Sequence, residues 1–313
     1  MSTAAPLSFA PTTAHVAYDY AVLDVFAEQP LQGNALAVFT DARGLTTEEM
    51  QAIARETNLN ETTFVLPRDE ATERERGIEV RIFTVREELP FAGHPTLGTA
   101  SWLYLNHPLF AGSETITLDL RAGPIQVTFE RDQQGPGVFG RMRQKDPVFG
   151  TVHDREAVAR ALGLTADDLD PGLPVETVST GMAFCIVPLR SLEVSARLAI
   201  PQQAAQQYLS GTDAKFFFCM TRASGDSGAD WHNRMQFYNG EDPATGSASG
   251  CAISYLVKHG VVASGAPIVF EQGVEIERPG RIHAQATLAG TRVENVFVGG
   301  RTIPIATGRL FLP

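Results

Sequence analysis

An eight-residue pattern occurs twice in this chain, about half a chain apart, and it constrains the fold more than any other feature. Residues 94–101 read HPTLGTAS and residues 242–249 read DPATGSAS, 148 residues further along. Pro, Gly, Ala and Ser match at the second, fifth, seventh and eighth places, and each copy follows a predicted strand that contains Arg and Phe. Small residues are common enough for four matches in eight to arise by chance. The offset of about half the chain favours duplication over chance. A duplication predicts two similar domains, each presenting the same strand–turn–helix element.

Apolar runs bounded by turn residues outnumber helical patterns along the chain, which favours an α+β fold with antiparallel-rich sheets over a doubly wound fold. The charge-dense run 68–76 is interpreted as a solvated loop. Strands are predicted at 20–26, 35–39, 62–66, 78–84, 115–120, 125–129, 184–189, 215–221 and 233–238. Helices are predicted at 45–57, after His94-Pro95, at 154–162, at 201–208, and from Pro243 to Lys258.

The predicted domains divide the chain near its middle. Residues 16–134 form the N-terminal domain, which we expect the C-terminal strand 301–313 to complete. Residues 135–300 form the C-terminal domain, and residues 1–15, rich in Ala, Thr and Pro, are predicted to be a loose tail.

The composition excludes several classes of partner. Acidic residues number 36 and basic residues 25, so the net charge is −11 and nucleic acid is an unfavourable partner. No apolar run approaches the roughly 18 residues of a membrane span. The N-terminus lacks the basic and apolar regions of a secretion signal. Three cysteines without a CxxC pair indicate a reducing compartment, so we expect a cytoplasmic protein.

The repeated element has the composition of a helix N-terminus that binds anions. His94 or Asp242 fits the cap position, and Pro95 or Pro243 fits the first helical position. The small residues that follow leave backbone N–H groups uncovered, and these groups attract a carboxylate or a phosphate. Two such helix ends facing each other across a cleft would hold a small acidic substrate. The alternative is two capped helices that pack through small residues.

Glu61 is the strongest candidate for proton transfer. It stands at the start of a predicted strand, between apolar Leu59 and Phe64, and such surroundings raise the pKa of a carboxyl group toward neutrality. The alternative is an exposed glutamate at a strand end. Glu87 and Glu88 belong to a charged loop and are interpreted as solvated.

Other chemistries find less support in the sequence. Residues 246–250 read GSASG and fit the G-x-S-x-G pattern of serine hydrolases, but Ser249 would lie inside a helix rather than on a strand-to-helix turn. The seven histidines form no HxH or HExxH pair, and no metal site is predicted. None of the three lysines lies in the repeated element, which disfavours pyridoxal phosphate, and no G-x-G-x-x-G pattern supports a dinucleotide.

Four ordered segments together resemble the PhzF-like family of phenazine biosynthesis. Weaker similarity continues at 179–181, 272–273 and 298–300, so the resemblance covers almost all of the chain beyond the first fifteen or so residues. The four segments are 24–39 (DVFAEQPLQGNALAVF), 56–64 (ETNLNETTF), 81–84 with 89–100 (RIFT and LPFAGHPTLGTA), and 241–248 (EDPATGSA).

The resemblance implies a diaminopimelate-epimerase-like fold, in which two pseudo-symmetric domains each curl a sheet around a central helix, with the site in the cleft. It implies an isomerase without metal or organic cofactor, and a homodimer. One family member acts on a dihydro-hydroxyanthranilate, and the glutamate that moves the proton there matches Glu61. A serine of the family motif is replaced by Asn60, which puts the side-chain contacts at that edge in doubt.

The resemblance also implies the remaining site residues. His94 and Asp242 match the family's histidine and aspartate at the helix heads. Racemases of the same fold carry two thiols at these places, so a two-thiol racemase is disfavoured. Cys251 is interpreted as a buried thiol. A protein that binds a small molecule without catalysis is the alternative. We expect the substrate to contact Asn34, Asn60, Gly93, Thr96, Gly246 and Ser247.

Overall fold

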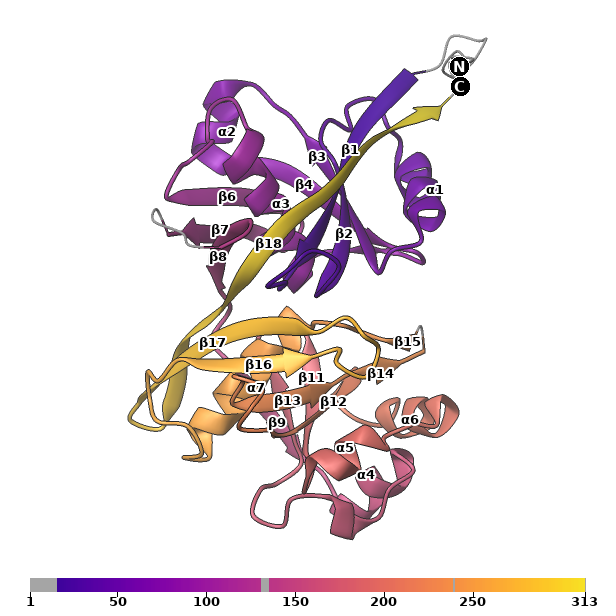
Figure 1. Cartoon of the computed structure of the whole chain (residues 1–313), viewed down its shortest axis with the longest axis vertical. Helices are drawn as coiled ribbons and strands as arrows, with labels where there is room; N and C mark the ends of the chain where they lie inside the picture. The colour runs from indigo at the N-terminus through magenta and orange to yellow at the C-terminus, as the bar shows by residue number, and fades with distance from the viewer. Residues whose placement is uncertain (1–15, 131–134, 239, 313) are drawn as a thin grey trace, which may run out of the picture.

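The computed structural model describes residues 16–130, 135–238 and 240–312, so the predicted tail 1–15 lies outside the described residues. The chain forms two halves that a single long strand joins (Figure 1). The first half contains β1 (Val16–Val25), β2 (Asn34–Phe39), α1 (Thr47–Thr57), β3 (Glu61–Leu66), α2 (Glu70–Arg76), β4 (Ile78–Thr84), β5 (Glu88–Leu89), α3 (Gly93–Asn106), β6 (Thr115–Leu120), β7 (Gly123–Phe129) and β8 (Val138–Arg143).

The second half follows without a long linker and ends in the strand that returns to the first half. It contains β9 (Val148–Val152), α4 (Arg155–Ala161), a short 3-10 helix (Ala166–Asp168), β10 (Glu176–Ser179), β11 (Ala183–Pro188), α5 (Leu192–Ala196), α6 (Gln202–Leu209), β12 (Phe216–Arg222), β13 (Trp231–Arg234), β14 (Gln236–Phe237), β15 (Gly240–Glu241), α7 (Gly246–Lys258), β16 (Ile268–Gln272), β17 (Gly280–Ala289) and β18 (Arg292–Leu312).

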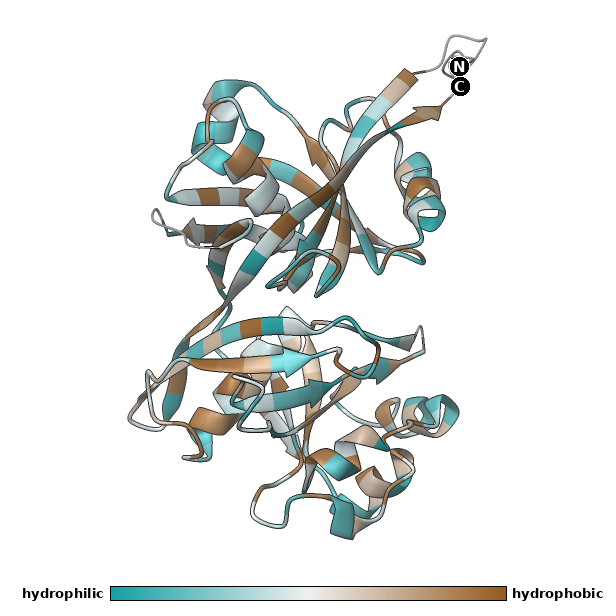
Figure 2. Cartoon of the chain, viewed as in Figure 1, coloured by the Kyte–Doolittle hydropathy of each residue, from teal (hydrophilic) through white to brown (hydrophobic). Residues whose placement is uncertain are grey.

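Most of the strands pair antiparallel, which confirms the predicted α+β fold with antiparallel-rich sheets. The parallel pairs among the described residues are β2 with β3, β4 with β6, β11 with β12 and β13 with β16. Helices α1 and α6, which lie outside the sheets, are amphipathic. In α1, for example, Met50, Ile53 and Ala54 face inward, and Figure 2 shows both brown and teal residues on this helix. None of the described helices is long and apolar enough to cross a membrane.

One helix in each half is buried and has the sheet curled around it. Helix α3 contacts β1, β2, β3, β6, β7, β8 and β18, and α7 contacts β10, β11, β17 and β18. Both helices are apolar on most sides, as expected of a helix in a core rather than on a surface. Small residues such as Gly98 and Ala248 let the surrounding strands approach.

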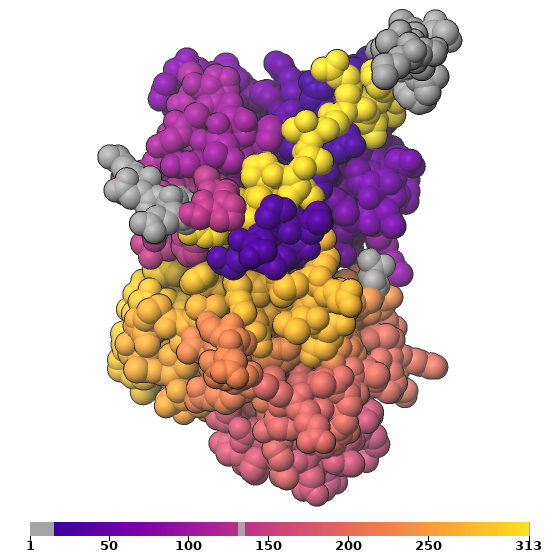
Figure 3. Space-filling model, in the orientation of Figure 1, coloured from indigo at the N-terminus to yellow at the C-terminus, as the bar shows by residue number. Residues whose placement is uncertain are grey.

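Strand β18 belongs to both halves. Its last residues pair with β1, from Val25 with Thr302 to Val16 with Leu312, while its first residues pair with β17 and its middle with β8. In the space-filling view its yellow residues run obliquely across the first half (Figure 3). The C-terminal strand thus lies against the first strand of the chain, and the boundaries near 134 and 300 remain our prediction.

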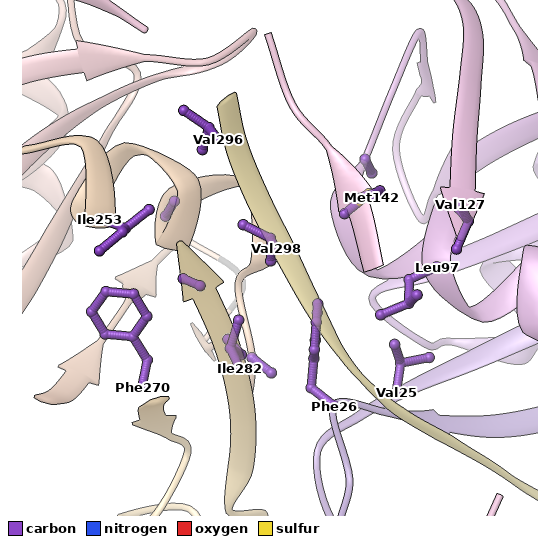
Figure 4. Close-up of a cluster of buried hydrophobic side chains, with 14 of the residues drawn as sticks. Val25, Phe26, Leu97, Val127, Met142, Ile253, Phe270, Ile282, Val296 and Val298 are labelled. Carbon is purple, nitrogen blue, oxygen red and sulfur yellow. The ribbon is translucent and has the colours of Figure 1, made fainter. Parts of the chain in front are cut away.

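Phe26 packs where the two halves meet. The residue is fully buried and has a left-handed backbone with φ of 60°, which is unusual for an aromatic residue. Its carbonyl accepts from Arg281 N at 2.8 Å, and a Cβ on Gly300 would lie 2.6 Å from its ring. In Figure 4, Phe26 lies next to β18, between the labelled Ile282 and Val25 of the same apolar cluster.

The structure shows that the internal repeat is real but that its predicted register is wrong. In each half, an arginine on a strand pairs with both carboxylate oxygens of the glutamate seven residues later: Arg81 with Glu88, and Arg234 with Glu241. The central helix then begins at a glycine, Gly93 or Gly246. These equivalent residues lie 153 positions apart, not 148.

The corrected register changes the predicted caps. The N-cap residues are Ala92 and Thr245, so neither His94 nor Asp242 caps a helix. Pro95 is the third helical residue, which is tolerated because N–H groups in the first turn have no acceptor within the helix. Ser247, rather than Asp242, is the counterpart of His94.

Two further predictions were wrong. Residues 70–76 of the supposed loop form α2, because Asp69 caps the helix through Thr72 N and the Glu73 carboxylate accepts from Arg68 N. Glu88 is not solvated, since its side chain is only 10% exposed and bonds to Arg81.

Candidate active site

A cavity of about 110 Å³ opens where the N-termini of α3 and α7 meet. One group of polar lining residues comes from the chain segments that precede and begin the two central helices, together with the start of β3. These residues are Asn60, Glu61, His94, Asp242, Thr245 and Ser247. Thr84, Arg86, Glu87 and Lys215 also line the cavity. The walls are apolar and aromatic, and they include Leu89, Phe91, Met182, Phe184, Phe216, Met235 and Phe237.

The two helix ends nearly touch. A Cβ on Gly93 would lie 2.9 Å from the backbone nitrogen of Ser247, so only glycine lets the two helices come this close. A Cβ on Gly246 would lie 2.8 Å from the ring of Phe26. The first-turn N–H groups of both helices lack intrahelical acceptors, and the positive ends of two helix dipoles point at the same place. This geometry suits a substrate carboxylate.

Glu61 and His94 face each other at the cavity floor. Glu61 Oε2 lies 3.4 Å from His94 Nε2, and both atoms are buried without a hydrogen-bond partner. Burial lowers the pKa of His94 to about 3, so the ring is neutral. The ring also bonds to the backbone of Ala35. Because Nε2 is the unpartnered nitrogen, we assign the donated proton to Nδ1, which leaves Nε2 as an acceptor toward Glu61.

Glu61 holds its proton at neutral pH. Burial raises the pKa of its carboxyl group to about 8, and the nearby charge of Asp242 raises it further in the same direction. A protonated carboxyl group facing an unprotonated imidazole nitrogen is a self-consistent arrangement. The predicted shift of the Glu61 pKa toward neutrality is therefore found in the structure, with burial as its main cause.

Asp242 is the second buried carboxyl group, and it is surrounded by donors. Its Oδ1 accepts from Asn34 Nδ2 at 2.8 Å and from Asn60 Nδ2 at 2.9 Å, and its Oδ2 accepts from the Thr245 hydroxyl. Burial raises the pKa of Asp242 to about 6, and these three donors oppose the rise. At neutral pH, Asp242 is therefore mostly ionised while Glu61 is mostly protonated.

The structure brings together most of the predicted site residues, but not all of them. Gly93, Gly246, Ser247 and Asn60 line the cavity, whereas Asn34 is buried behind Asp242 and supports it from there. Thr96 is fully buried, does not line the cavity, and donates its hydroxyl to the Ala92 carbonyl.

The sequence did not reveal the cavity walls. Phe184 lies on β11, Phe216 on β12 and Met235 beside β13, so the fold assembles residues that are far apart along the chain. The run of three phenylalanines at 216–218 was the one available signal, but a strand core explains it equally well.

Neither Ser249 nor Cys251 of α7 lines the cavity. The Ser249 hydroxyl lies inside α7 and donates to the Thr245 carbonyl. Cys251 is buried as predicted, and its Sγ lies 3.6 Å from Thr180 Oγ1. Across residues 16–130, 135–238 and 240–312, the structure gathers no group of three or more His, Cys, Asp or Glu side chains arranged to hold a metal ion.

Comparison with known proteins agrees with this geometry. The family model of phenazine biosynthesis-like proteins, PhzC-PhzF, matches residues 23–308. The trans-2,3-dihydro-3-hydroxyanthranilate isomerase of Pseudomonas aeruginosa is 37% identical over 301 residues, which cover 94% of this chain and 99% of that protein.

Solved structures give the same result for the fold. A PhzF-family phenazine biosynthesis protein of Bacillus anthracis aligns with a TM-score of 0.84 at 28% identity, over 95% of this chain and all of the other. A probable proline racemase of Agrobacterium radiobacter aligns with a TM-score of 0.63 at 11% identity, over 95% of this chain and 93% of the other. The predicted diaminopimelate-epimerase-like fold is confirmed.

Proposed function

The chain belongs to the phenazine biosynthesis-like protein family and is an isomerase of that family, and from this premise we propose that it moves a proton between two carbon atoms of a small cyclic carboxylate, with Glu61 as the acid and base. The observation that carries the proposal is the pairing of two buried carboxyl groups with different pKa values at the meeting point of two helix ends. Proton transfer of this kind needs no metal or organic cofactor, and we propose that none takes part.

The proton transfer involves only the substrate and the Glu61 side chain. Ionised Glu61 accepts the proton from an allylic carbon, and the electron pair of that C–H bond becomes a new carbon–carbon double bond. The pair of the former double bond takes the proton back from Glu61 at the distal carbon. Glu61 is thereby restored, and the substrate leaves as an isomer.

The other floor residues orient the substrate for this step. The N–H groups at the starts of α3 and α7 would hold its carboxylate, because they are the positive ends of two helices. His94 Nε2 and ionised Asp242 would accept hydrogen bonds from substrate hydroxyl or amino groups. The apolar walls would exclude water and keep the pKa of Glu61 high.

The named relative supplies the first substrate to test. Proton NMR of the wild type in D₂O with trans-2,3-dihydro-3-hydroxyanthranilate should show conversion with deuterium incorporated at carbon. Glu61→Gln should reduce turnover by at least about a thousand-fold while the protein stays folded, because it removes the group that carries the proton. Glu56→Gln, an exposed glutamate nearby, is the matched control and should leave turnover unchanged.

Two outcomes would contradict the proposal. Near-normal turnover in Glu61→Gln would remove Glu61 from the mechanism. Binding of cyclic carboxylates to the wild type without any exchange of carbon-bound hydrogen would favour the alternative of a small-molecule-binding protein.

A further inference from the structure

A second depression adjoins the cavity and shares part of its wall. Glu87, Leu89, Phe91, Met182 and Lys215 line both spaces. The second depression continues past this shared wall to Arg143, Lys145 and the backbone of 180–181. A ligand too long for the cavity would therefore extend past Phe91 and Met182 into this depression, which we call the vestibule.

The vestibule concentrates positive charge in a strongly acidic protein. The chain has a net charge of −11 and only three lysines, yet two of them, Lys145 and Lys215, line the vestibule. The third, Lys258, is bound to Glu176 at 2.5 Å. Both vestibule lysines are exposed, and within the described part of the chain neither has a carboxylate at ion-pair distance.

The acidic groups of the vestibule do not cancel this charge. Glu88 bonds to Arg81 at 2.7 Å and to Arg121 at 2.9 Å, so it is already neutralised. Glu87 is exposed and is the remaining acid of the lining. Arg143 is 3.7 Å from Asp146, a pair exposed enough to contribute little, and Arg86 stacks over the Tyr238 ring at the cavity mouth.

We propose, on the basis of the function proposed above, that the physiological substrate carries a second anionic group on a flexible arm, and that Lys145 and Lys215 bind this group in the vestibule. The ring and its carboxylate would occupy the cavity between the aromatic walls and the helix ends. The second group is a carboxylate or a phosphate, since both bind lysine ammonium groups. The charge would also steer such a dianion toward an otherwise repelling protein.

Binding measurements with three ring carboxylates of equal length test the proposal without requiring turnover. The probes are para-pentylbenzoate, para-(carboxybutyl)benzoate and para-(phosphonobutyl)benzoate, with Kd measured by calorimetry at low and at high salt. At low salt, the wild type should bind at least one dianion about ten-fold more tightly than the monoanion, and salt should reduce this preference. Whichever dianion binds more tightly identifies the second group as a carboxylate or as a phosphate.

Charge-removing variants assign the preference to the two lysines. Lys145→Gln and Lys215→Gln should each reduce it a few-fold, and the double variant should abolish it. Lys145 lies outside the cavity, so Lys145→Gln alone should leave the Kd of para-pentylbenzoate unchanged. Arg190→Gln, which removes an exposed charge outside both spaces, is the matched control and should keep the full preference.

Equal affinity for all three probes, including no binding of any, would overturn the proposal, and so would a preference that survives in the double variant. This result is separable from the mechanism. Failure of Glu61→Gln to stop hydrogen exchange would contradict the proposed function, whatever the lysine variants do to binding.

Discussion

Glu61 and Asp242 carry the same chemical group and share one buried site, yet their surroundings separate their pKa values. Asp242 accepts from two asparagine side chains and one threonine hydroxyl, whereas Glu61 Oε2 has no donor. Donors stabilise the ionised form and burial stabilises the neutral one. The difference lies in the neighbouring residues, and Asn60 contributes to it because its amide supplies one of the three donors to Asp242.

The pH profile of kcat/KM reports this difference directly. If ionised Glu61 takes the first proton, kcat/KM should rise with pH and level off above about 8, the pKa to which burial raises its carboxyl group. Asp242→Asn removes a repelling charge, so the pKa of Glu61 should fall and the rising limb should move to lower pH at reduced activity. A limb that stays in place in Asp242→Asn would contradict the coupling between the two carboxyl groups.

Gly93→Ala tests the close approach of the helix ends. The added methyl group would lie 2.9 Å from backbone at Ser247, where no side chain can rotate away. We expect a loss of about 1–3 kcal/mol in the free energy of unfolding, measured by urea denaturation, and weaker binding of para-pentylbenzoate. Gly225→Ala, where a Cβ would meet nothing within 4 Å, should change stability by less than about 0.5 kcal/mol.

The arginine–glutamate pair of the repeated element positions the backbone that carries Asp242. Each pair closes the short hairpin that leads into a central helix, β4–β5 in one half and β14–β15 in the other. Glu241 directly precedes Asp242, so the pair with Arg234 fixes the backbone that carries the second carboxyl group. Arg234 also donates to the carbonyls of Ser195 and Leu198, which ties the hairpin to α5.

Removing the arginine should cost more in the second half than in the first. Arg234→Gln leaves the Glu241 carboxylate buried without a cation and with only the Gln236 amide as a side-chain donor, and we expect a loss of about 3–5 kcal/mol in the free energy of unfolding. In Arg81→Gln, Glu88 keeps Arg121, so the loss should be smaller. The double variant Arg234→Gln/Glu241→Gln should recover part of the stability. Equal losses in the two single variants would contradict this account.

Local sequence patterns predicted most of the helices and strands. The errors arise where contacts between distant parts of the chain decide the structure. Thr46 and Glu49 form the capping box that starts α1, where a helix was predicted. The repeat was aligned on Pro, Gly, Ala and Ser, which are common, instead of on the arginine, the glutamate and the first helical glycine that have the same role in both halves. The raised pKa of Glu61 could be predicted from its apolar neighbours, but the vestibule could not, because Lys145 and Lys215 line one depression only in the folded chain.

At the scale of the whole molecule, β18 makes the two halves one unit. The strand pairs with β1, β8 and β17. The apolar cluster around Phe26 contains residues from both halves. The homodimer and the cytoplasmic location stay predictions.

Deleting residues 301–313 tests the role of β18. The deletion removes the partners of β1 from Val16 to Val25, so we expect a loss of several kcal/mol in the free energy of unfolding. The cooperative thermal transition followed by circular dichroism should disappear or shift down by more than about 10 °C. Phe311→Ser, which changes an exposed residue near the end of the strand, should leave the transition almost unchanged. A truncated chain that unfolds at the wild-type temperature would show that β18 is dispensable.

The pairing of Val16 with Leu312 also sets an order of events during synthesis. The ribosome makes β1 well before its partner, and at about 5–20 residues per second roughly 15–60 s separate the two. Throughout that interval one edge of β1 has no strand to pair with, and an unpaired edge recruits other chains. We therefore expect nascent chains to need shielding of this edge until β18 has been made, and a synthetic peptide of residues 292–313 is the natural complement for rescuing a chain that stops short of it.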